Sequence, residues 1–181
     1  MAYPTVDKPY GLQPVNLIGG QVYAGSTRLM RIASGYSTSI YYGDVVKLAS
    51  DGTVQKDTGT STATPVGIFV GCTYTNPSTN QKTFALYWPA STAASDAQAY
   101  VVDDPDILFK VATVSSGTTV ATASFPIRIV DIVPDTSNGS NGFCEYICKF
   151  NAPYVTISVS LSGANTATVT GGHAYLNPTG V

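Results

Sequence analysis

Short runs of β-branched and aromatic residues, separated by Gly, Pro, Asn and Asp, follow one another along this sequence from about residue 21 onward. Such runs predict an all-β fold, a small barrel or sandwich. Asp51-Gly52, between the runs at 43–49 and 53–56, is a strong hairpin signal. Further strands are expected at residues 65–75, 82–90, 99–104, 107–114, 124–133, 142–150, 154–162 and 166–171. Little helix is expected, at most a turn or two in 28–34 and 91–99.

Residues 1–20 predict an extended N-terminal arm rather than a core element. Pro4, Pro9 and Pro14 recur along it, and proline removes a backbone donor and holds its neighbours extended, so the segment cannot join a central strand. Its apolar side chains indicate docking on a partner or on the body of the protein. We therefore expect an arm at 1–20 and a single β-rich domain at 21–181, in which 153–172 forms an extra hairpin.

Charge is scarce in this chain. Asp, Glu, Lys and Arg make up 11% of the residues, against roughly 25% in an ordinary soluble domain. Interface cores are depleted in charge and enriched in tyrosine, so the composition favours a protein that packs against neighbours. The net charge of −2 and the scattered basic residues argue against nucleic-acid binding, which needs clustered Lys and Arg.

The three cysteines do not form a disulfide framework. If residues 143–150 are a strand, Cys144 and Cys148 lie about 13 Å apart at about 3.3 Å per residue, too far to bond. With Cys72 they are expected to be reduced and buried, as in a protein made in a cytoplasm. No signal peptide and no membrane span are expected.

No residue set in the sequence predicts catalysis, and no enzyme activity is expected. His173 is the only histidine, and it has no partners for a triad or a zinc site. No serine lies in a Gly-x-Ser-x-Gly elbow, and no phosphate-binding glycine loop is present. The interpretation favoured for His173 is local packing or hydrogen bonding.

Three other features of the sequence are candidate binding sites. Asp103, Asp104 and Asp106 form the densest carboxylate group, either a Ca²⁺ site or, as we favour, a strand end whose aspartates are solvated or cap backbone amides. Residues 135–142 resemble a calcium loop but have Tyr146 where its glutamate belongs. Trp88 suits a sugar platform or, as favoured, a core or interface. No cofactor, metal or small-molecule substrate is expected.

An ordered set of phrases resembles a family of tailed-bacteriophage capsid decoration proteins, also called cement or head-stabilising proteins. The phrases are VDKPYGLQPV, YYGDVVKLASDGTV, PVGIFVGCTYTN, FALYWPAS, AYVVDDPDILFKV and the ending HAYLNPTGV. The stretch GDVVKLASDGTV to Trp88-Pro89 is also similar to the β-tulip domain of lambda-type head decoration proteins. The stretch 153–172 departs from the pattern.

The resemblance implies a structural protein on the capsid surface of the virion, made in the host cytoplasm. It implies a homotrimer that binds the major capsid protein and cements neighbouring copies of it. The alternative is a carbohydrate-binding β-module of a phage tail or fibre. Removal of residues 2–16 is expected to weaken attachment and leave the β-domain folded. The residues expected to bind the capsid are Tyr3, Pro4, Val6, Pro9, Tyr10, Leu12, Pro14 and Val15.

Overall fold

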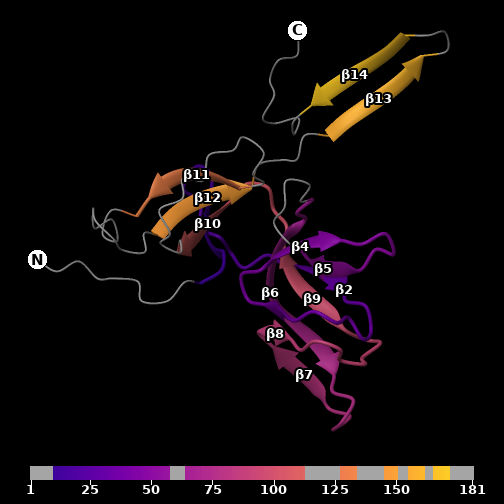
Figure 1. Cartoon of the computed structure of the whole chain (residues 1–181). Helices are drawn as coiled ribbons and strands as arrows, with labels where there is room; N and C mark the ends of the chain where they lie inside the picture. The colour runs from indigo at the N-terminus through magenta and orange to yellow at the C-terminus, as the bar shows by residue number, and fades with distance from the viewer. Residues whose placement is uncertain are drawn as a thin grey trace, which may run out of the picture. The chain divides into compact units, whose positions relative to one another are not determined.

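The computed structural model describes residues 10–57, 64–112, 127–133, 145–150, 155–161 and 165–171 (Figure 1). Every regular element in these ranges is a β-strand, so the predicted all-β class is confirmed. The helical turns predicted at 28–34 and 91–99 are wrong. Residues 28–31 instead form a strand that pairs with residues 98–101, and residues 91–97 are turns and irregular backbone.

The chain divides into two compact units, residues 1–150 and 151–181. The second unit contributes one hairpin, described below. The strands of the first unit are β1 (Gln13–Leu17), β2 (Arg28–Arg31), β3 (Ile40–Tyr41), β4 (Val45–Leu48), β5 (Val54–Lys56), β6 (Gly67–Thr75), β7 (Lys82–Ala85), β8 (Tyr87–Trp88), β9 (Gln98–Val102), β10 (Ile107–Ala112), β11 (Ile127–Ile132) and β12 (Glu145–Phe150).

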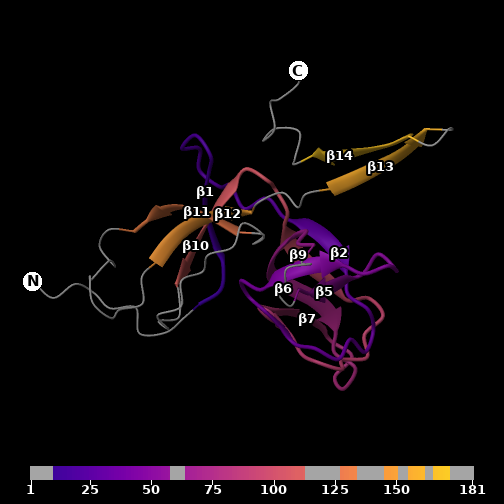
Figure 2. The ribbon, with the colours of Figure 1, turned by 45° about the horizontal axis from the view of Figure 1, so that its top comes forward.

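A four-stranded antiparallel sheet has the order β1-β10-β12-β11 (Figure 2). Strand β1 comes from the predicted arm and lies at one edge, with Pro14 in it and a register shift between Pro14 and Asn16. Proline lacks an N–H and is confined to edge strands and bulges. Residues 13–17 of the expected arm are therefore part of the folded domain.

The larger sheet has the order β2-β9-β6-β4-β5, with β7 also paired to β6. The sheet curls so that its two edge strands, β2 and β5, approach each other. A single isolated parallel bridge joins Ile32, the residue after β2, to Val54 of β5. In the described residues the sheet stays open and does not close into the expected barrel. The curled sheet encloses a core in which Trp88 and Phe69 are fully buried. A two-stranded ribbon, β3 with β8, adjoins this core through Ile40 and Trp88.

A second apolar cluster joins the two sheets. Phe109 and Cys148 come from the four-stranded sheet, and Ile68 and Val102 come from the larger one. Leu12, just before β1, is buried in the same cluster. Cys72 and Cys148 are free and buried, which confirms the expectation for these two thiols. Cys144 lies outside the described residues.

The second unit contains the hairpin of β13 (Val155–Leu161) and β14 (Asn165–Gly171), whose antiparallel register runs from Val155↔Gly171 to Leu161↔Asn165. This is the hairpin predicted at 153–172. His173 and the calcium-like loop at 135–142 lie outside the described residues.

Candidate interaction surface

The aspartates after β9 are engaged in a turn and in ion pairs. Asp104 Oδ1 accepts a hydrogen bond from the backbone N–H of Asp106 at 2.9 Å. Asp103 pairs with Arg28 at 2.9 Å, and Asp106 Oδ1 lies 3.5 Å from the ammonium of Lys149. Within the described part of the chain no group of three His, Cys, Asp or Glu side chains could hold a metal ion. The geometry is that of a capped strand end.

Trp88 is in the core and not on the surface. Its ring is fully buried and packs edge-on against Tyr74, with ring centroids 5.3 Å apart and planes at 77°. The indole Nε1 has no hydrogen-bond partner among the described residues. A sugar platform built on Trp88 is therefore incompatible with this fold.

Five exposed apolar or aromatic side chains belong to β3, β7 and β8 and to the residues beside them. We call them the aromatic surface: Tyr41, Tyr42, Phe84, Leu86 and Tyr87. Phe84 to Tyr87 are nearly consecutive, and the β3–β8 register places Tyr87 opposite Tyr41. Phe84 is 72% exposed and Leu86 67%. Tyr41 and Tyr87 are in direct contact, because their rings stack. Exposed apolar side chains that cluster mark interaction sites more often than scattered ones do.

The aromatic surface arises from a bend in the chain. Along β7, Thr83 and Ala85 are half-buried and Phe84 points outward, as strand alternation requires. Strict alternation would place Leu86 and Trp88 on the same face as Phe84. The chain bends at Leu86 between β7 and β8, so that Leu86 stays exposed while Trp88 enters the core.

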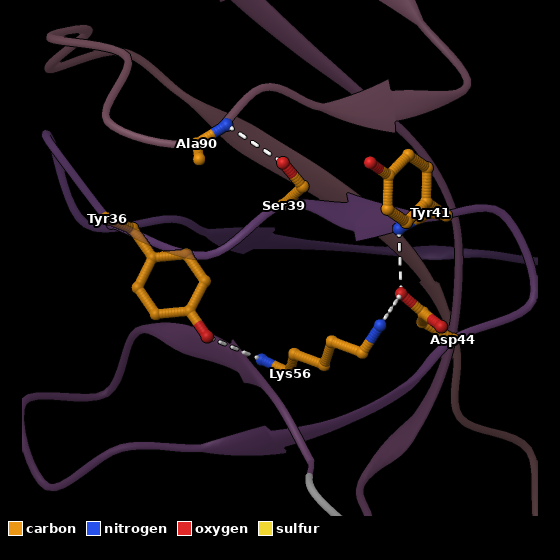
Figure 3. Close-up of polar contacts among 6 residues, drawn as sticks. All are labelled: Tyr36, Ser39, Tyr41, Asp44, Lys56 and Ala90. Atoms are coloured by element: carbon orange, nitrogen blue, oxygen red, sulfur yellow. Dashed lines mark hydrogen bonds and ion pairs between the residues drawn. The ribbon is translucent and has the colours of Figure 1, made fainter.

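Tyr41 is held by a polar network (Figure 3). Asp44 Oδ2 accepts hydrogen bonds from the Tyr41 backbone N–H at 2.8 Å and from Lys56 Nζ at 2.7 Å. Lys56 Nζ also lies 5.8 Å from the centroid of the Tyr41 ring, within range of a cation–π interaction. The Tyr41 ring also stacks on Tyr87, with centroids 6.1 Å apart. Two further bonds tie the strand backbone around it: the Lys56 N–H donates to the hydroxyl of Tyr36, and the Ala90 N–H donates to Ser39 Oγ.

Residues 10–12, which we call the base of the arm, are fastened to the four-stranded sheet at Tyr10. Its hydroxyl donates to the carboxylate of Glu145 on β12, and Lys110 Nζ lies 3.4 Å from Glu145 Oε1. The same ammonium is 5.6 Å from the centroid of the Tyr10 ring. Burial and the hydrogen bond to Glu145 raise the pKa of Tyr10 above its usual value. The phenol therefore stays protonated and keeps its role as donor.

A second fastening joins the arm base to the turn between β3 and β4. The N–H of Leu12 donates to the carbonyl of Gly43 at 3.0 Å. A Cβ placed on Gly11 or on Gly43 would lie 2.7 Å from the backbone of the other, so the two backbones are in direct contact. Leu12 itself is 4% exposed. The expectation that residues 2–16 can be removed without loss of the β-domain conflicts with this packing.

The structure thus divides the residues expected to bind the capsid. Tyr10 and Leu12 contact the protein's own domain, while Pro14 and Val15 lie on edge strand β1, where Val15 is partly exposed. Tyr3, Pro4, Val6 and Pro9 lie outside the described residues. Sequence reasoning missed the aromatic surface, although the alternation of residues 82–85 already placed Phe84 on one face.

Comparison with known proteins adds no relative. No family model, curated protein or solved structure matches this chain. In the described ranges no helix is long and apolar enough to cross a membrane.

Proposed function

We propose that this chain is a structural virion protein that binds the outer surface of a tailed-phage capsid and cements neighbouring major capsid proteins. The ordered sequence resemblance supports this proposal, and the homotrimer that the resemblance implies belongs to it. The chain contributes binding surfaces and no chemistry of its own. Stabilisation follows from mass action, because a protein that binds the assembled lattice better than its separated subunits favours the lattice.

The observation that carries the proposal is the fastening of the arm base to both sheets. Tyr10 is bonded to β12, and Gly11 and Leu12 are packed against the turn before β4. An arm that binds a capsid can attach the domain firmly only if the base of the arm, residues 10–12, stays bound to the domain. Residues 10–12 are held by the buried side chain of Leu12, by the backbone contact of Gly11 with Gly43, and by the hydrogen bond of Tyr10 to Glu145. The segment that links the expected arm to the domain is therefore fixed to the domain.

The scarcity of charge supports the same role. Only 11% of the residues are charged, and the aromatic surface exposes large apolar side chains. A protein that is covered by neighbours in an assembly has less need of surface charge than a free monomer.

The test is removal of residues 2–9, which spares Tyr10, Leu12 and β1. Whole and shortened protein are mixed with empty capsids of the phage that encodes the chain, and bound protein is measured by co-sedimentation. We expect the shortened protein to bind at least about tenfold more weakly, a loss of about 1.4 kcal/mol or more, with an unchanged melting temperature. Val22→Ala, a change at an exposed side chain between β1 and β2 that is not among the residues expected to bind the capsid, is the control and should bind as the whole protein does.

Equal binding of the whole and shortened proteins would show that the arm does not attach the domain. Absence of saturable binding by the whole protein would remove the capsid proposal altogether. Binding of the whole protein to a glycan array would then favour a carbohydrate-binding module, with the exposed Tyr41 and Tyr87 as the first residues to replace.

A further inference from the structure

We draw no further inference here: the strongest candidate, the aromatic surface together with the edge of β7 that no described strand pairs with, carries none, because nothing in the described residues shows what covers it.

Discussion

The contact between Gly11 and Gly43 leads to a sharp prediction for Gly43→Ala. Gly43 has a φ of +86°, where an L-residue costs about 1–2 kcal/mol. Its new Cβ would also lie 2.7 Å from the backbone of Gly11, so the arm base must move. That movement breaks the hydrogen bond from the Leu12 N–H to the Gly43 carbonyl, which contributes about 1 kcal/mol to stability. It also exposes part of the Leu12 side chain, whose full burial contributes about 1.5–3 kcal/mol. The expected loss of stability is about 3–5 kcal/mol.

Gly52→Ala is the matched control. Gly52 has nearly the same φ, +77°, but nothing lies within 4 Å of its added Cβ. It should lose only the conformational cost of about 1–2 kcal/mol. The difference between the two variants, at least about 2 kcal/mol, isolates the backbone contact. Gly11→Ala makes the same contact without the positive φ and should lose about 2–3 kcal/mol.

The assay is equilibrium unfolding in urea, followed by the fluorescence of Trp88. This is the only tryptophan of the chain and is fully buried in the first unit, so its signal reports on that unit. The urea concentration at the midpoint should fall least in Gly52→Ala, more in Gly11→Ala and most in Gly43→Ala. The slope of the unfolding free energy against urea concentration should stay unchanged. Equal losses in Gly43→Ala and Gly52→Ala, or no loss in Gly11→Ala, would refute the fastening of the arm base.

Two further predictions concern titratable groups. Burial raises the pKa of Cys72 to about 11 and that of Cys148 to about 12. At about pH 8 a free thiol is partly ionised and reacts with a thiol reagent. In a Cys144→Ser variant, Cys72 and Cys148 should therefore react only as the protein unfolds. Rapid reaction of these two thiols in the native protein would contradict this. Bonding to Lys82 and to a threonine on β6 lowers the pKa of Asp96. A lowered carboxyl pKa gives stability that is complete above the unfolded value of about 3.9 and is lost as the pH falls toward the folded value. On acidification below about pH 4 the melting temperature should thus fall more for the natural protein than for Asp96→Asn, and parallel curves for the two would exclude this contribution.

Local signals in the sequence predicted the local structure. Asp51-Gly52 is a turn between β4 and β5, with the N–H of Thr53 bonded to Asp51 Oδ1 at 2.9 Å and Gly52 at positive φ. Pro14 excluded a central strand, and the segment that contains it is an edge strand. These features depend on a few neighbouring residues, which the sequence shows directly.

Features that depend on distant partners were not predictable in this way. Residues 28–34 carry a pattern compatible with a helical turn, and only the pairing of Arg28–Arg31 with β9 makes them a strand. The contact of Gly11 with Gly43 joins segments that no local pattern relates. Only part of the candidate site could be predicted from the sequence. The arm follows from a local pattern of prolines, but the aromatic surface depends on the bend at Leu86 and on the pairing of Tyr41 with Tyr87.

The central claim is that this protein cements a capsid, and the most direct measurement is the thermal stability of capsids with and without it. Empty capsids of the encoding phage are heated with increasing amounts of the whole protein, and their disassembly is followed by light scattering. The account predicts a disassembly temperature that rises with protein concentration and saturates, and a smaller rise at equal concentration for the protein that lacks residues 2–9. A disassembly temperature that does not change at saturating protein would contradict it.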